Sequence, residues 1–266
     1  MAIIINKQIK ILLVVLCLVF LCVFGFSAYK IISTINGYKV AEENYNSMSQ
    51  QFVTTTETTP KPSAEPGNEE EEEEPVEVSP ISVDFAALQA QNPEAAGWIY
   101  CPNTVINYPI AHTEDNFTYL DHLLSGEMNA NGTIFIDCQN AKDFSDKNTL
   151  LYGHNMNDGS MFASLRNYRD AAYYPEHPCL YISTPEKNYR LDLFAGFVTE
   201  PDSYVYARQF DADEQFLAYV ESAKAESTFQ SDVEVSIEDR IVVLSTCTYE
   251  FDDARYVVIG KLVEIQ

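Results

Sequence analysis

The pattern of hydrophobic and polar positions divides the chain into three parts. Residues 11–29 contain no charged side chain, and residues 11–26 are almost wholly apolar. Residues 54–80 are polar and include six consecutive glutamates at 69–74. From residue 81 onward, short runs rich in β-branched and aromatic residues alternate with turn residues. This third pattern is typical of an all-β barrel or sandwich.

The first part predicts a membrane-spanning helix, so we assign residues 1–30 to a cytoplasmic tip and a transmembrane anchor through residues 11–29. With its flanks, the run just reaches the length needed to cross a bilayer core of about 30 Å. Lys7 and Lys10 precede it and Lys30 follows it, which gives a weak bias toward a cytoplasmic amino terminus. The rest of the chain is then extracellular. The alternative is a cleaved signal peptide, although the run is longer than the usual signal core.

The second part, residues 31–80, is predicted to be an extracellular linker rich in proline and glutamate. Residues 53–80 hold nine acidic side chains and one lysine. Such a stretch buries too little apolar surface to offset its ordering entropy, and its like charges favour extension. It is either a stalk that holds a domain away from the membrane or a linker without a task.

The third part, residues 81–266, has the size of a single domain. Its β-branched and aromatic runs predict eight strands, at residues 97–100, 104–110, 132–137, 149–153, 180–183, 189–198, 240–246 and 255–263. Apolar residues one turn apart predict packing helices at residues 84–90 and 213–225. A further helical turn is expected at residues 161–165.

Charge and composition narrow the classes of function. The chain has 16 Lys and Arg against 40 Asp and Glu, a formal charge of −24, and this excludes a nucleic-acid partner because phosphate contacts need clustered cations. No cysteine or histidine pair in the third part has zinc-ligand spacing, so we expect no metal site and no cofactor. We expect three cysteines to be buried apolar thiols with at most one disulfide among them: Cys101, Cys138 and Cys179.

Cys247 differs from the other cysteines by its context. An apolar strand at residues 241–244 runs into it, and the chain then becomes polar. A thiol at the end of a rigid strand, facing a polar loop, is well placed to act as a nucleophile. Arg255 begins the next strand, so a hairpin would bring its guanidinium near the sulfur to hold a carbonyl or an oxyanion. The acids of the connecting loop, residues 250–253, are expected to be solvated rather than catalytic.

A second candidate for chemistry is His154, which follows a predicted strand and Gly153. Imidazole can donate and accept protons near neutral pH, as acyl transfer through a thioester requires. His112, His122 and His177 lack this context and are expected to be surface or structural residues. From the residues alone, a core cysteine and a surface histidine remain the alternative to catalysis.

Three motifs resemble those of the sortase family, and they follow one another along the chain in the order histidine, cysteine, arginine. The sequence Leu-Ser-Thr-Cys at residues 244–247 resembles the T-L-x-T-C signature of sortases. Tyr-Gly-His-Asn at residues 152–155 is similar to their histidine motif, and Arg255 follows the cysteine at the expected place. Val243 departs from the threonine that begins the signature; we expect it to lie off the reactive face and to affect packing rather than chemistry.

Two further segments, residues 92–99 and 115–120, together with a helix between the late strands, resemble class B sortases in particular. The resemblance covers residues 81–266. It implies a mainly β fold, a closed sortase-type barrel of about eight strands with peripheral helices, preceded by the transmembrane helix.

The resemblance also implies an activity and a set of site residues. Cys247 would be the nucleophile, His154 the general acid and base, and Arg255 the group that stabilises the substrate carbonyl or the oxyanion. The substrate-binding groove of the family maps onto five positions: Asn116, Leu120, Tyr152, Ser245 and Thr246. Leu120 and Tyr152 have core packing as their alternative role, and Asn116 the capping of a turn.

The implied enzyme is a membrane-anchored cysteine transpeptidase. It would cleave an Asn-Pro-x-Thr type C-terminal sorting signal of secreted proteins and join the threonine carbonyl, through a thioacyl enzyme, to a peptidoglycan precursor amine. One alternative is a pilin-polymerising sortase, which uses a lysine acceptor. Another is a non-catalytic anchored β-domain that binds a surface ligand. A papain-like protease is disfavoured, because its cysteine opens a helix early in the chain.

Overall fold

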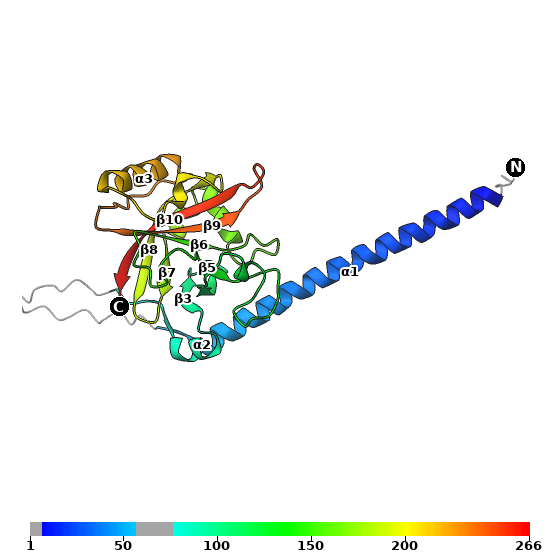
Figure 1. Ribbon diagram of the computed structural model, residues 1–266, viewed down its shortest axis with the longest axis horizontal. Coiled ribbons are helices and arrows are strands. Elements are labelled where there is room, and N and C mark those ends of the chain that lie inside the picture. The colour runs from blue at the N-terminus through cyan, green and yellow to red at the C-terminus, as the bar shows by residue number, and fades with distance from the viewer. Residues whose placement is uncertain (1–6, 57–76) are drawn as a thin grey trace, which may run out of the picture.

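The computed structural model describes residues 7–56 and 77–266 (Figure 1). A closed barrel forms the body, and the helix α1 (Lys7–Phe52) extends away from it as a long rod. Residues 57–76, which belong to the predicted linker, lie outside the described residues.

Eight strands close the barrel, and each corresponds to one of the eight predicted strands. They are β3 (Ala95–Tyr100), β4 (Asn107–Ala111), β5 (Ile134–Ile136), β6 (Asn148–Tyr152), β7 (Cys179–Ser183), β8 (Asn188–Thr199), β9 (Arg240–Cys247) and β10 (Arg255–Ile265). Their order around the barrel is β10-β8-β7-β3-β4-β5-β6-β9. The β4/β5 and β6/β9 pairs are parallel and the others are antiparallel. The predicted closed, mainly β barrel is therefore confirmed.

Alternation along the strands builds two hydrophobic clusters. On β9, Val242 and Leu244 belong to the cluster that fills the barrel. Val243, one position out of phase, belongs to a second cluster on the outer face. The helix α3 (Asp213–Glu226) covers that outer cluster with Phe216 and Val220, close to the predicted helical range. Period-two alternation thus gives one strand buried on both faces.

The expectation that Val243 lies off the reactive face is wrong. Residues 243, 245 and 247 share one side of β9 because side chains alternate with period two. Val243 is fully buried in the outer cluster beneath α3. Its side chain packs on the same face of β9 that carries Cys247, four residues further along the strand.

The shorter helices agree broadly with their predictions. α2 (Phe85–Gln91) begins after Asp84, whose side chain accepts a hydrogen bond from the Ala87 backbone N–H. This is the usual capping of an orphan donor at a helix start. The predicted turn near residue 161 forms slightly later, as the 3-10 helix Ala163–Arg169.

The folded unit begins earlier than the predicted boundary at residue 81. The last turns of α1 bury a stripe of four side chains against the barrel: Ala41, Tyr45, Met48 and Phe52. Their spacing of four, three and four residues places them on one helix face. Directly after the helix, β1 (Val53–Thr55) pairs with β2 (Ile81–Val83). Residues in the range assigned to the linker therefore form part of the domain's core.

Polar contacts hold the same helix in place. The Tyr45 hydroxyl donates to the Gly132 carbonyl and lies 3.1 Å from the Thr133 hydroxyl. Asn129 Nδ2 donates to the Gly37 carbonyl at 2.9 Å. Gly132 has φ +57, and a Cβ there would meet the Tyr119 carbonyl oxygen at 2.3 Å, so the turn that receives Tyr45 requires glycine.

The amino-terminal half of α1 differs from this packed end. Its apolar side chains are exposed, and its most apolar window has a mean hydropathy of 3.0 with none of it buried. Among the described residues, this is the one helix long and apolar enough to cross a membrane.

We expect Tyr45→Ala to lower the free energy of unfolding by about 3 kcal/mol, because it removes a buried ring packed edge-on against Tyr108 and leaves a cavity. Urea unfolding in detergent micelles measures the change. Lys39→Ala, an exposed substitution on the same helix, is the control and should change stability by less than about 0.5 kcal/mol. Equal midpoints for the two variants would show that α1 does not pack on the barrel in solution.

Candidate active site

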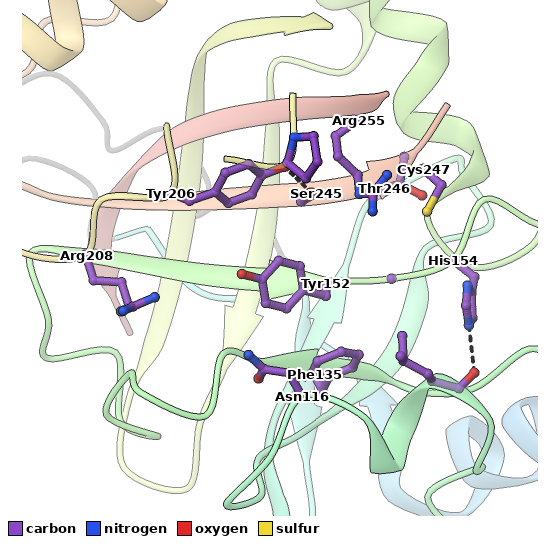
Figure 2. Close-up of a pocket in the computed structure, with 13 residues that line it drawn as sticks. Asn116, Phe135, Tyr152, His154, Tyr206, Arg208, Ser245, Thr246, Cys247 and Arg255 are labelled. Atoms are coloured by element: carbon purple, nitrogen blue, oxygen red, sulfur yellow. Dashed lines mark hydrogen bonds between the residues drawn. The ribbon is translucent and has the colours of Figure 1, made fainter. Parts of the chain in front are cut away.

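A pocket of about 400 Å³ opens on the outer face of the barrel, where β6 and β9 end and β10 begins (Figure 2). Its lining includes all eight residues named as site residues from the sequence: Asn116, Leu120, Tyr152, His154, Ser245, Thr246, Cys247 and Arg255. The chain brings them together from segments more than 100 residues apart in sequence.

Strand register explains how Cys247 and Arg255 meet. They are directly opposed in the antiparallel β9/β10 pair, and opposed residues point to the same face of a sheet with Cβ atoms about 5 Å apart. On the other side of β9, Ser245 is opposed to Tyr152 of β6. Ser245, Cys247, Arg255 and Tyr152 therefore continue the outer face of the barrel beyond the cluster covered by α3.

His154 is fixed by the turn that follows β6. The Gly153 backbone N–H donates to the Ser245 carbonyl at 3.1 Å, which prolongs the β6/β9 pairing by one step. A Cβ at Gly153 would meet Ile134 Cδ1 at 2.4 Å and Phe162 Cδ2 at 2.6 Å. Only glycine fits this close approach, so the glycine before the histidine positions the imidazole.

The contacts of the imidazole define its tautomer. His154 Nε2 lies 2.7 Å from the Leu120 carbonyl oxygen (Figure 2). A carbonyl can only accept, so Nε2 carries a hydrogen and Nδ1 is left as the site that gains or loses a proton. Leu120 thus contributes its backbone to the histidine as well as lining the pocket.

Asn155 links the turn that carries His154 to the strand that carries Cys247. Its Nδ2 donates to the Cys247 carbonyl at 2.8 Å, and the side chain is buried. Asn155 also forms an isolated antiparallel bridge with Met161. The residues directly before and after His154, Gly153 and Asn155, therefore both form hydrogen bonds to the strand that carries Cys247.

The Arg255 guanidinium is anchored by backbone carbonyls. Its Nη1 donates to the carbonyls of Asp253, at 2.7 Å, and Ala254, at 3.2 Å. Within the described residues, no carboxylate forms an ion pair with it. Several of its five N–H donors can therefore face a substrate oxygen.

The loop acids are placed differently from one another. The Glu250 carboxylate pairs with Arg169 and accepts a hydrogen bond from the Thr248 hydroxyl at 2.6 Å. Partial burial alone would raise the pKa of Glu250, but the Thr248 hydrogen bond, backbone hydrogen bonds and the Arg169 charge together lower it. Glu250 is thus ion-paired rather than simply solvated. Asp253 orients Arg255 only through its backbone carbonyl.

The far wall of the pocket is organised by Asp137, which sequence reasoning missed. Its Oδ2 accepts hydrogen bonds from Asn116 Nδ2 and from the Tyr152 hydroxyl, both at 3.0 Å. The Asn116 Oδ1 in turn accepts the Cys138 backbone N–H at 2.8 Å. Burial and the Asp137 charge raise the pKa of Tyr152, so the phenol stays neutral. Asn116 and Tyr152 are thus rigid parts of the wall.

Sequence reasoning also missed Phe135 of β5, which lines the pocket, and three lining residues from the segment between β8 and α3: Pro201, Tyr206 and Arg208. The Tyr206 hydroxyl lies 2.9 Å from Ser245 Oγ, and its ring stacks with Tyr152 at a centroid distance of 6.5 Å. Burial raises the pKa of Tyr206. This segment carries no sequence motif, and only its aromatic content could have suggested a role.

Thr246 contributes less side chain to the pocket than the sequence suggested. It alternates with Ser245 and Cys247, so it belongs to the barrel-facing side of β9. Its side chain is almost fully buried and its hydroxyl has no hydrogen-bond partner.

The remaining cysteines lie outside the pocket. The Cys101 thiol donates to the Cys179 carbonyl at 3.8 Å, and burial raises the pKa of Cys101 to about 11. Burial also raises the pKa of Cys179. In residues 7–56 and 77–266, no three His, Cys, Asp or Glu side chains gather into a group that could hold a metal ion.

Comparisons with known proteins agree with this arrangement. The Sortase domain family model matches residues 99–263. A Sortase B of Listeria monocytogenes is 41% identical over 178 residues, which cover 66% of this chain and 72% of the relative. A Sortase B of Staphylococcus aureus is 29% identical over 254 residues, which cover 94% and 95%. The solved Staphylococcus aureus sortase B–substrate complex has a TM-score of 0.66 at 30% identity, covering 68% of this chain and 85% of that chain.

The matched region runs from within β3 to within β10 and includes Cys247, His154 and Arg255. It spans more than half of the chain, and both curated relatives and the solved structure are class B enzymes. The chain therefore belongs to the sortase family of cysteine transpeptidases, as a class B sortase.

Proposed function

We propose that this sortase cleaves an Asn-Pro-x-Thr type sorting signal at the carboxy terminus of secreted proteins and joins the threonine carbonyl to a peptidoglycan amine. Cys247 is the nucleophile, His154 the general acid and base, and Arg255 the oxyanion ligand. The single observation that carries the proposal is that these three side chains line one pocket. The register of β9 and β10 supports the pairing of thiol and guanidinium.

In the first half-reaction, the Cys247 thiolate attacks the threonine carbonyl carbon. A bond forms between Sγ and that carbon, and the carbonyl electron pair moves to oxygen. The free N–H donors of Arg255 stabilise this oxyanion, as fixed donors do in acyl transfer. The C–N bond then breaks, His154 gives its Nδ1 proton to the departing amine, and a thioester remains on Cys247.

In the second half-reaction, the acceptor amine attacks the thioester carbonyl. His154 Nδ1, now neutral, takes the proton that the amine loses. The bond between Sγ and the acyl carbon breaks, and the Cys247 thiolate leaves. An amide forms, so the bond energy of the original peptide is conserved and no further reactant is consumed.

The pocket wall suggests how the signal is held. Asn116, Leu120, Tyr152 and Ser245 line the same pocket as the three catalytic groups. Leu120 is 40% exposed and offers an apolar contact, while the Tyr152 and Tyr206 rings offer flat surfaces for a proline ring. We propose that these residues, with Thr246 supporting the strand, bind the sorting signal.

We further propose that α1 anchors the enzyme, with the barrel outside the cell. Its apolar half is exposed over the length of a bilayer crossing. Anchoring raises the effective concentration of a membrane-bound acceptor near the pocket. A pilin-polymerising sortase would use the same catalytic groups and differ only in its lysine acceptor, and a non-catalytic binding domain would form no thioester.

The first test uses peptides and intact mass. A form beginning at Gly37 keeps the packed end of α1. Incubated with Asn-Pro-x-Thr and Leu-Pro-x-Thr peptides, it should gain a peptide adduct on Cys247, preferring the former. Cys247→Ala should form no adduct and lose at least about a thousandfold in transpeptidation. Failure of every peptide to react with reduced, folded protein would favour the binding-domain alternative. A product formed with a peptidoglycan amine would support joining to peptidoglycan. A product formed with a pilin lysine would support the pilin-polymerising alternative.

The role of Arg255 predicts a loss in kcat rather than in peptide binding. Arg255→Ala should lower kcat about a hundredfold or more, because an oxyanion donor acts in the transition state. Arg255→Lys should recover only part of this, since a single ammonium does not replace the planar fork. Arg166→Ala, outside the pocket, is the matched control. A rise in KM at constant kcat would instead assign Arg255 to uniform substrate binding.

Alkylation should distinguish the cysteines of the barrel. At pH 8 the buried Cys101, with its pKa raised to about 11, is almost entirely thiol and should react slowly with iodoacetamide. Its rate should rise about tenfold for each pH unit up to about 11, where the thiolate fraction levels off. Cys247, which lines the open pocket, should be modified at pH 8. Peptide mapping by mass reads both sites, and rapid labelling of Cys101 at pH 8 would contradict its burial.

A further inference from the structure

The side chains that line the candidate active-site pocket carry positive charge, although the chain as a whole is strongly acidic. Among the described residues, the lining includes two arginines, Arg208 and Arg255, and neither Asp nor Glu. The whole chain has 40 Asp and Glu against 16 Lys and Arg. Arg255 is opposed to Cys247, whereas Arg208 has no part in the proposed catalytic steps. A second guanidinium is therefore available to a substrate.

Most hydrogen-bond donors of Arg208 are unused. Its Nη2 donates to Gln139 Oε1, and this is the one hydrogen bond that the side chain donates within residues 7–56 and 77–266. Its Nη1 lies 3.6 Å from Asp137 Oδ1, which is too far for a hydrogen bond. A guanidinium has five N–H donors, so several remain for a further acceptor. The Arg208 side chain is 31% exposed, which lets that acceptor approach from the pocket.

The Asp137 carboxylate holds Arg208 in place without occupying its donors. The Asp137 side chain is 4% exposed. Its Oδ1 accepts the Gln139 backbone N–H at 3.0 Å, and its Oδ2 accepts the hydrogen bonds from Asn116 and Tyr152. Three shorter contacts therefore already satisfy this buried carboxylate. Its charge attracts the guanidinium from behind the pocket wall, and the N–H groups of Arg208 stay free for a ligand.

Arg208 lies at the end of the pocket away from the thiol. Figure 2 shows Cys247 and His154 at one end and Arg208 at the other, with the rings of Tyr152 and Tyr206 between them. The pocket is thus elongated, with one cationic group beside the nucleophile and one far from it.

Strand register gives the approximate separation of the two ends. The Asp137 backbone N–H donates to the Leu150 carbonyl at 2.9 Å. Leu150 is opposed to Val243 of β9, which precedes Cys247 by four residues. At about 3.3 Å per residue, the part of the wall that holds Arg208 lies roughly 13 Å from the thiol along the strand.

The proposed chemistry sets the direction in which a sorting signal lies in this pocket. His154 protonates the departing amine, so the residues after the threonine leave on the side of His154. The residues before the threonine stay on Cys247 as the acyl group and run the other way, toward Arg208. In an Asn-Pro-x-Thr signal, the residue directly before the asparagine is four positions from the threonine, which is about 13 Å in an extended chain. That residue reaches Arg208.

We propose that Arg208 forms a subsite for an acidic residue directly before the asparagine of the sorting signal. A guanidinium can bind a carboxylate through two parallel, charge-assisted hydrogen bonds. An amide at the same position lacks the charge, and a lysine is repelled. The inference rests on the proposed sorting-signal substrate and adds a specificity position outside its four-residue motif.

Direct binding tests the subsite without requiring catalysis. Full-length Cys247→Ala in detergent micelles is titrated with three peptides that differ only in the residue before Asn-Pro-x-Thr, which is Asp, Asn or Lys. The Asp peptide should bind about tenfold more tightly than the Asn peptide, the value of one charged hydrogen bond, and the Lys peptide should bind most weakly. Adding Arg208→Gln should remove this order, and Arg208→Lys should retain part of it. Arg166→Gln, at an arginine outside the pocket, is the matched control and should keep the full preference.

Kinetics with the active full-length enzyme provide the second readout. KM for the Asp peptide should be about tenfold below KM for the Asn peptide at similar kcat, because Arg208 lies far from the reacting carbonyl and acts through binding alone. In Arg208→Gln the two KM values should be equal. A difference confined to kcat would contradict a binding subsite at this end of the pocket.

The outcomes separate the subsite from the proposed function. Equal affinity for the three peptides would overturn the inference, and so would a preference for Asp that survives Arg208→Gln. An equal loss with all three peptides in Arg208→Gln would overturn it in favour of a contact with the motif itself. An adduct on Cys247 that forms regardless of the preceding residue would reject the subsite and leave the proposed function standing. Acid-dependent binding without any peptide cleavage would instead reject the proposed function and leave the subsite standing.

Discussion

The pairing of β9 on both sides is the constraint on which the rest of the structure depends. β9 lies between β6, to which it is parallel, and β10, to which it is antiparallel. The parallel partner delivers His154 to the carboxyl end of β9, and the antiparallel partner begins at that same end with Arg255. One strand therefore fixes three functional groups from distant parts of the sequence, and a one-residue slip in either register would turn the opposed side chains to the wrong face.

The same strand connects the hydrophobic core to the candidate active site. Ile241 and Val243 lie on the outer face under α3, and Ser245 and Cys247 continue that face beyond the edge of the helix. Burial at the first two positions holds the backbone that presents the last two. The adjacent bond from Asn155 to the Cys247 carbonyl then limits how far the histidine turn can move from the thiol. Such rigid support is what a nucleophile and its acid–base partner require.

Particular residues show what the sequence could and could not predict. The eight strands could be predicted because β-branched and aromatic runs alternate with turns. Cys247, His154 and Arg255 could be predicted because each stands at a strand end within a recognisable motif. Asp137 was not, since its role depends on Asn116 and Tyr152 converging on it across the sheet. Tyr206 and Arg208 lie in an irregular segment whose path only the folded barrel defines. The stripe from Ala41 to Phe52 has helical spacing, but it contains too few apolar residues to predict that this helix face packs against the barrel.

The extent of α1 changes how the proposed anchor and the barrel would be related. An anchor on a flexible stalk would let the pocket sample many heights and orientations, and only the mean distance from the membrane would be controlled. Here the helix that carries the apolar segment is the helix whose last turns bury Tyr45 and Phe52 in the domain core. A continuous helix transmits orientation as well as distance, because its residues rise by a fixed step and turn by a fixed angle. The face of the barrel that looks back toward the apolar segment is therefore determined by the packing of the last turns of α1.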